Sequence, residues 1–298
     1  AALSFYNPDT TPWIIGAVEA VLVGYCLLGG GKRVIKATST LVPLMGVIYI
    51  SVAFILTIMH INLVPGVVGR IFAEAFDFSA IFGGFAGSCM MFGIKRGLYS
   101  NEAGVGSAPN AAAAADVSHP VKQGLVQMLS VFIDTLLICT ATAFMCLSSG
   151  IEPTKELAGA PYVQAALAAS MGDYAKLFIT VSMVLFAFTT LLGNLYYVDN
   201  AFAYVLKHVP GKTFTLCYRI LACVLIFIGA GSSMGTMWDL ADVTMGFMAI
   251  INLPVICILG GPALRALDDY TEQRNAGKNP EFKASKIGLT QKLDYWQD

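Results

Sequence analysis

Long apolar stretches alternate with short polar connections along most of the chain. A helix needs roughly 20 apolar residues to cross about 30 Å of hydrocarbon, and seven stretches approach that length. We expect membrane spans at residues 13–28, 41–59, 80–93, 124–147, 177–198, 220–231 and 243–261. The third and the sixth are short, so they are either extended by less hydrophobic turns or interrupted. This pattern predicts an all-α polytopic membrane protein.

Basic residues are distributed unevenly among the polar connections. Of the 18 Lys and Arg residues, 15 fall in alternate segments and 3 in the others, and six of the 15 lie in the tail. Cytoplasmic loops carry the excess of basic residues. We therefore expect a transmembrane domain at residues 1–262, with its first residues outside the cell, and a charged cytoplasmic tail at residues 263–298.

Composition excludes several classes of protein. Hydrophobic residues make up 56% of the chain and charged residues only 12%, about half the charged fraction of an ordinary soluble domain. The net charge of -1 provides no positive field that would attract nucleic acid. The cysteines and histidines show no zinc-binding spacing, so neither a metal centre nor another cofactor is expected. The chain begins at Ala1 without an initiator Met or a signal peptide, which predicts a fragment of a longer protein.

The most unusual segment lies at residues 80–115 and reads AIFGGFAGSCMMFGIKRGLYSNEAGVGSAPNAAAAA. Its apolar half ends at Gly93, a polar half rich in glycine follows, and a run of alanines closes it. Gly and Pro at this density disfavour a continuous helix and leave backbone amides and carbonyls unpaired. At membrane depth such backbone survives only beside a cavity or a solute. The alternative is a plain cytoplasmic loop after a short third span.

Part of this segment, GIKRGLYSNEAGVGSAPNAAAAA, closely resembles the hallmark of the alanine/glycine:cation symporter family, also called sodium:alanine symporters. The resemblance extends to GGGKRVIKATSTLVPLMGVIY, LFAFTTLLGNLYY and MWDLADVTMGFMAIINLP, and it leaves out only the charged tail. It implies a leucine-transporter-type fold of about eleven spans, built from two inverted five-helix repeats and one extra helix. The present chain would hold the last seven spans, and missing N-terminal helices of the same protein would complete the fold.

The resemblance places a broken helix at residues 80–115, and the chemistry of a zwitterion agrees with that assignment. An amino acid in a low-dielectric site needs partners for both charges, and broken helices offer amide ends to the carboxylate and carbonyls to the ammonium. Side chains of Ser and Asn can hydrogen-bond, and glycines let a solute approach the backbone. We assign substrate binding to Tyr99, Ser100, Asn101, Gly104 and Gly106. The alternative is a helix cap within a loop.

Candidates for ion binding and gating lie outside that segment. Sodium prefers oxygen ligands, and the resemblance implies that Thr189 and Thr190 contribute hydroxyls to a sodium site. Each hydroxyl could instead bond to the carbonyl one turn back in its own helix. Asp134 lies within a span, where it is either part of a cation path or a structural acceptor. Trp238 is either a gate residue or a member of the aromatic belt.

The resemblance implies a secondary active transporter in the cell membrane of a prokaryote, and not an enzyme. We expect a sodium-coupled symporter that imports a small neutral amino acid, alanine or glycine, by alternating access, with Na⁺ as coupling ion and membrane lipid around its spans. Coupling to protons stays open. The alternative is a seven-helix membrane receptor or photoreceptor, which is disfavoured because residues 243–261 contain no lysine for a retinal Schiff base.

Overall fold

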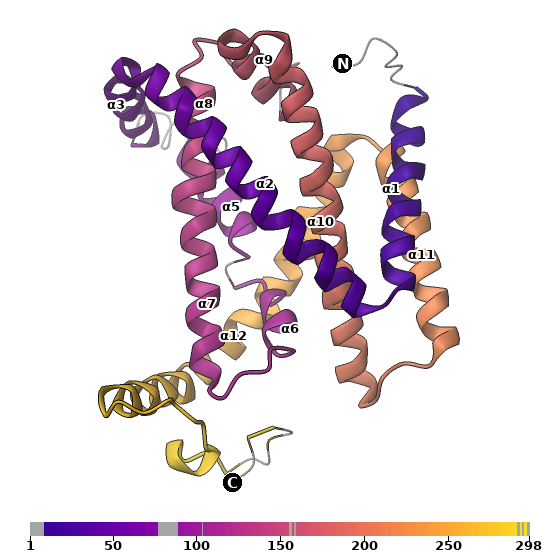
Figure 1. Cartoon of the computed structure of the whole chain (residues 1–298), viewed down its shortest axis with the longest axis vertical. Helices are drawn as coiled ribbons and strands as arrows, with labels where there is room; N and C mark the ends of the chain where they lie inside the picture. Colours follow the sequence, from indigo (N-terminus) through magenta and orange to yellow (C-terminus); the bar gives the residue numbers. More distant parts are fainter. Residues whose placement is uncertain are drawn as a thin grey trace. The chain divides into compact units, whose positions relative to one another are not determined.

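The computed structural model describes residues 9–76, 89–102, 104–154, 157, 159–290, 293 and 295–296. Within these ranges the chain forms helices joined by turns and loops (Figure 1). The longer helices are α1 (Thr11–Leu28), α2 (Gly31–Met59), α3 (Val64–Ala75), α5 (Cys89–Ser100), α7 (Pro120–Phe132), α8 (Thr140–Leu147), α9 (Ala160–Met171), α10 (Asp173–Leu206), α11 (Lys212–Gly231) and α12 (Met234–Asn275). Shorter elements are η1 (Ile61–Leu63), α6 (Ala108–Ala112), η2 (Ile133–Cys139) and η3 (Ala284–Ile287).

Six helical segments among the described residues are long and apolar enough to cross a membrane, and each contains one of the expected spans. They are α1, α2, the continuous run from α7 through α8, α10, α11 and α12. The expected span at residues 80–93 lies mostly outside the described residues. The short sixth span is extended by less hydrophobic turns, because α11 begins at Lys212 rather than near residue 220. The protein is therefore a polytopic helical membrane protein.

The chain divides into two compact units. Unit 1 comprises Ala1–Gly97 and Asp134–Trp238, and unit 2 comprises Leu98–Ile133 and Asp239–Asp298.

In unit 1, α1 and α11 lie side by side and run antiparallel (Figure 1). Small residues allow their backbones to approach closely, since a Cβ atom added to Gly16 would lie 2.5 Å from that of Ala230. At the same end of the pair, the ring of Trp13 packs on Phe227 with 5.1 Å between centroids. Membrane helices associate through such close packing because lipid supplies no hydrophobic driving force between them.

The main apolar cluster of unit 1 joins α2, α8, α9 and α10. Its buried members are Tyr49, Ala53, Leu56, Met145, Leu167, Ala175 and Ile179. The Tyr49 hydroxyl also shares a hydrogen bond of 2.8 Å with the Thr142 hydroxyl on α8. This pairing satisfies two polar groups inside an apolar cluster, so it fixes the register between α2 and α8 at little cost.

Arg219 joins three helices of unit 1. Its Nη1 donates to the Leu27 carbonyl of α1 at 2.6 Å, and its Nη2 donates to Asp199 Oδ2 of α10 at 3.0 Å. The Leu27 carbonyl lies in the last turn of α1, where it also accepts a hydrogen bond of 2.8 Å from the Gly30 amide. Counting basic residues by loops placed Arg219 in a connection, whereas the structure places it inside α11.

We expect Arg219→Ala to destabilise the complete protein by about 2 kcal/mol, because it leaves the half-buried carboxylate of Asp199 without its charged partner. Thermal unfolding of the purified protein in detergent measures the effect. Lys212→Ala, at the exposed start of the same helix, serves as the control. Equal unfolding temperatures for the two variants would contradict this account of Arg219.

Candidate functional site

The helix interruption between α5 and α6 is the most distinctive feature of unit 2. α5 ends at Ser100 and α6 begins at Ala108. Between them the backbone adopts positive φ at Glu102 (49°), Gly104 (77°) and Gly106 (94°). Glycine reaches this region without steric penalty, whereas other residues do so rarely. The chain therefore leaves the helical conformation inside the segment that the sequence singles out.

The proposed substrate residues divide between the helix and the interruption. Tyr99 and Ser100 lie in the last turn of α5, whereas Asn101, Gly104 and Gly106 lie between α5 and α6, in the stretch 101–107 that we call the break and of which residues 101, 102 and 104–107 are described. All five belong to unit 2.

Internal hydrogen bonds give the break a defined shape. The Ser107 hydroxyl donates to Glu102 Oε2 at 2.6 Å, and the Val105 amide donates to the Glu102 carbonyl at 3.1 Å. Asn110 Nδ2, on α6, lies 3.3 Å from the Gly106 carbonyl and 3.2 Å from that of Ser107. Glu102 thus organises the break and brings a carboxylate into it. Glu102 was not among the binding residues expected from the sequence, although an acidic residue within a glycine-rich interruption is itself a signal.

Asn252 of α12 binds the break through a side-chain hydrogen bond. Its Nδ2 donates to the Gly104 carbonyl at 3.0 Å. A Cβ atom on Gly106 would lie 2.8 Å from Asn252 Cγ, and one on Gly104 would lie 2.7 Å from Leu253 Cδ2. Both glycines are therefore required by close contact with α12 as well as by their φ angles. Asn252 also went unnoticed in the sequence, although it is the one amide side chain within residues 243–261 and an amide in an apolar span needs a partner.

The two proposed sodium ligands lie next to each other on α10 but have different surroundings. Thr189 is 6% exposed, and its hydroxyl donates to the carbonyls of Leu185 (2.9 Å) and Phe186 (3.1 Å). It also lies 4.0 Å from the sulfur of Met45. Thr190 is exposed. The Thr189 hydroxyl thus makes the back-bond that threonine commonly makes in membrane helices, while its oxygen lone pairs can still serve a cation.

The remaining candidates occupy distinctive positions in unit 1. Asp134 lies in η2, a π-helical stretch between α7 and α8, and π-helical turns are frequent at functional sites. Trp238 is 38% exposed, and the guanidinium carbon of Arg96 lies 4.2 Å from its ring centroid. This cation–π contact connects the hallmark segment to the first turns of α12.

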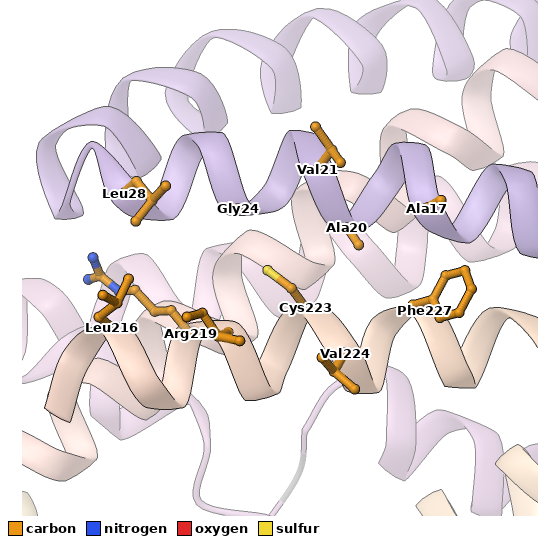
Figure 2. A pocket seen from close by; sticks show the side chains of 11 residues that line it. Ala17, Ala20, Val21, Gly24, Leu28, Leu216, Arg219, Cys223, Val224 and Phe227 are labelled. Atoms are coloured by element: carbon orange, nitrogen blue, oxygen red, sulfur yellow. The ribbon is translucent and has the colours of Figure 1, made fainter. Parts of the chain in front are cut away.

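The groove between α1 and α11, with a volume of about 540 Å³, does not match the chemistry of an amino-acid site (Figure 2). Small and apolar residues line it, including Ala17, Ala20 and Gly24 on α1 and Phe227 on α11. Its charged member, Arg219, already pairs with Asp199. A zwitterion would leave its ammonium without a partner there. Among the described residues, no three His, Cys, Asp or Glu side chains gather in a way that would hold a metal ion.

Comparison with known proteins gives a family and several relatives. The model of the sodium:alanine symporter family matches residues 2–284. The amino-acid carrier protein AlsT of Bacillus subtilis (strain 168) is 42% identical over 96% of this chain and 60% of its own length. The probable sodium/glutamine symporter GlnT of the same organism is 40% identical over 99% of this chain and 61% of its own length. The sodium/alanine symporter AgcS of Methanococcus maripaludis is 38% identical over 92% and 60%, respectively. The chain spans about 60% of the length of these relatives.

We expect Gly106→Ala to destabilise the complete protein by about 1–3 kcal/mol, because alanine at a φ of 94° is strained and its Cβ would collide with Asn252. Gly66→Ala is the matched control, since a Cβ atom there meets nothing within 4 Å and lies in a helix. Alanine at that position should be neutral or stabilising. Thermal unfolding compares the two variants, and an unchanged Gly106→Ala protein would contradict the described packing of the break.

Proposed function

Because the chain belongs to the sodium:alanine symporter family, we propose that the complete protein is a sodium-coupled symporter that imports a small neutral amino acid. The family is one of transporters and not of enzymes. The observation that carries the proposal is the break at residues 101–107, which interrupts a helix within the segment that resembles the family hallmark. The receptor and photoreceptor alternative has no use for such an interruption.

The substrate is alanine or glycine. Residues 101–107 present peptide groups, the Asn101 amide and the Glu102 carboxylate in one short stretch, which suits the two charges of an amino acid. Positive φ at Gly104 and Gly106 turns the backbone without adding side-chain bulk. Because Leu253 and Asn252 fill the space beside these two glycines, a solute would contact the other groups of the break, which is in keeping with a small substrate. Tyr99 and Ser100, in the last turn of α5 directly before the break, are the other proposed binding residues.

Sodium is the coupling ion, and Thr189 with Thr190 supplies hydroxyl ligands. The remaining ligands come from parts of the protein outside this chain, which covers about 60% of its relatives. Asp134 and Trp238 are candidates for the cation path and a gate. The name of GlnT makes glutamine a substrate worth including in any assay.

The driving forces are large enough for useful accumulation. One positive charge entering across about 100 mV releases about 2.3 kcal/mol, and a roughly tenfold sodium gradient adds about 1.4 kcal/mol. Together they support an amino-acid gradient of some hundreds-fold. We propose that the complete protein uses them through alternating access in a leucine-transporter-type inverted-repeat fold. The excess of basic residues in alternate connections supports a cytoplasmic C-terminal segment in the cell membrane of a prokaryote.

We expect proteoliposomes that contain the complete protein to take up radiolabelled alanine or glycine when an inward sodium gradient is imposed. Replacing sodium by lithium, or by a proton gradient alone, identifies the coupling ion, and unlabelled glutamine tests competition. Empty liposomes give the background. Uptake that does not depend on sodium would assign another coupling ion, and the absence of uptake for both labelled amino acids would refute the proposal.

A second expectation concerns the sodium site. Thr190→Ala should raise the sodium concentration for half-maximal uptake by about tenfold, because a lost oxygen ligand costs about 1–2 kcal/mol. Thr189→Ala should act in the same direction. Thr57→Ala, which removes an ordinary back-bonded hydroxyl from α2, should leave the sodium dependence unchanged. If all three variants match the parent protein, α10 does not contribute these hydroxyls to the ion site.

A further inference from the structure

We propose that the segment after Ala266 is a latch that fastens the loop leaving α6 to the end of α12 and so restrains α6. The loop is residues 113–119, and the latch is the last turns of α12 together with the described residues 276–296. All of these residues belong to unit 2. The contacts are independent of what is transported, but a role in the transport cycle rests on the proposed function.

Three hydrogen bonds to backbone carbonyls join the two segments. The Phe282 amide donates to the Ser118 carbonyl at 3.0 Å, and the Ser118 hydroxyl donates to the Pro280 carbonyl at 2.9 Å. The Trp296 indole donates to the Val117 carbonyl at 3.3 Å. These bonds join segments more than 160 residues apart in the sequence. They hold the loop in place through specific hydrogen bonds, in addition to covering it.

Side-chain bonds complete the attachment. Lys122 Nζ, in the first turn of α7, donates to Ser118 Oγ at 2.6 Å and to Asn279 Oδ1 at 2.7 Å. The Gln273 side chain bonds to both the amide (3.0 Å) and the carbonyl (2.9 Å) of Glu281. This second pair folds the chain back after α12 and presents residues 279–282 to the loop.

His119 lies at the centre of the latch. Its side chain is fully buried, with the rings of Tyr270 and Phe282 packed edge-on at 5.2 Å each. Nδ1 accepts a hydrogen bond from the Val121 amide at 3.3 Å and so caps the start of α7. Nε2 therefore carries the proton and donates to Asp269 Oδ2 at 3.3 Å. The neutral imidazole satisfies both partners.

A protonated His119 fits the latch poorly. A proton on Nδ1 would face the Val121 amide and remove the cap of α7. Burial lowers the pKa of His119, the hydrogen bond and charge of Asp269 on α12 oppose that shift, and the charges of Lys122 on α7 and Lys286 on η3 reinforce it. Tyr270, from α12, also faces the ring, and its hydroxyl accepts a hydrogen bond of 3.2 Å from Arg274 Nη1 of the same helix.

The strength of the latch depends on pH. The closed latch holds His119 with a lowered pKa, whereas the open loop returns it to an ordinary value of about 6.5. The latch is therefore at full strength above pH of about 6.5 and weakens as the pH falls through that value towards the lower pKa of the closed form. Acidification around this segment should open it.

The latch restrains α6, because it holds the loop that follows this helix. α6 contains only five residues, and the break lies directly before it. Asn252 of α12 holds the break, and Asp269 near the end of the same helix holds His119. Both ends of the segment that contains α6 are thus attached to α12. While the latch is closed, α6 can move only together with α12.

Hydrogen exchange of the complete protein in lipid nanodiscs tests the proposal without requiring transport. Phe282→Ala removes the ring that covers His119 and should speed exchange of the amides in α6 and residues 113–119 by at least about tenfold, because losing a buried phenyl ring weakens its local unit strongly. Phe72→Ala, an exposed ring on α3, is the matched control and should change nothing there. Unchanged exchange in Phe282→Ala would overturn the latch.

The same measurement at pH values of about 5.5 and 7.5, corrected for intrinsic exchange, tests His119. The parent protein should exchange faster in the loop at the lower pH. His119→Asn keeps an acceptor for the Val121 amide but cannot be protonated, so this acid response should disappear. A response that persists in His119→Asn would remove His119 from the device.

Uptake assays supply the functional arm. Phe282→Ala should raise the initial rate of alanine uptake at an unchanged half-saturating alanine concentration, because a restraint has been removed outside the substrate residues. A slower or unchanged rate, together with faster exchange, would overturn the restraining role. If the parent protein transports no amino acid, the proposed function fails, and exchange in α6 still decides whether the latch restrains that helix.

Discussion

Peptide groups that leave a helix and are withdrawn from water need hydrogen-bond partners inside the protein, and this constraint explains the most specific contacts around the break. The break after α5 frees such groups, and Asn252 binds one of them, the Gly104 carbonyl. That bond requires the amide to lie close against the break, so Gly106 has no room for a side chain beside Asn252, and Gly104 has none beside the neighbouring Leu253. The hydrogen bond and the two glycines thereby depend on the same close approach of α12.

The same constraint organises unit 1. The carbonyl of Leu27 lies in the last turn of α1, and Arg219 reaches it from α11 while also pairing with Asp199. Tyr49 and Thr142 satisfy each other within an apolar cluster. Lipid cannot provide hydrogen-bond partners, so each polar group in these helices specifies which neighbour its helix accepts. Apolar side chains contribute packing here, while paired polar groups determine register.

Much of the architecture could be predicted from the sequence because its signals are local. Apolar length located six spans that the structure describes, and clustered glycines located the break. Contacts between distant residues could not be predicted in this way. Asn252 went unnoticed, because its partner is 148 positions away in the sequence. Arg219 was counted among the loop residues, because hydropathy does not reveal the half-buried carboxylate of Asp199 beside it. The neighbouring hydroxyls of Thr189 and Thr190 looked equivalent, but successive helix positions point about 100° apart and only the first is buried.

α12 crosses the boundary that composition predicts between the transmembrane domain and the charged tail. Residue 262 separates an apolar stretch from a charged one, yet the helix continues from Met234 to Asn275 across it and contains two prolines. Each proline removes one hydrogen bond without ending the helix. Both prolines, Pro254 and Pro262, lie between Asn252 and Asp269, so the two contacts with the segment that contains α6 stand on either side of the weakened part of one helix. The charged end of α12 and the break are consequently connected through a helix rather than through a loop. The apolar and the charged parts of α12 therefore hold one segment between them, although composition alone would divide them.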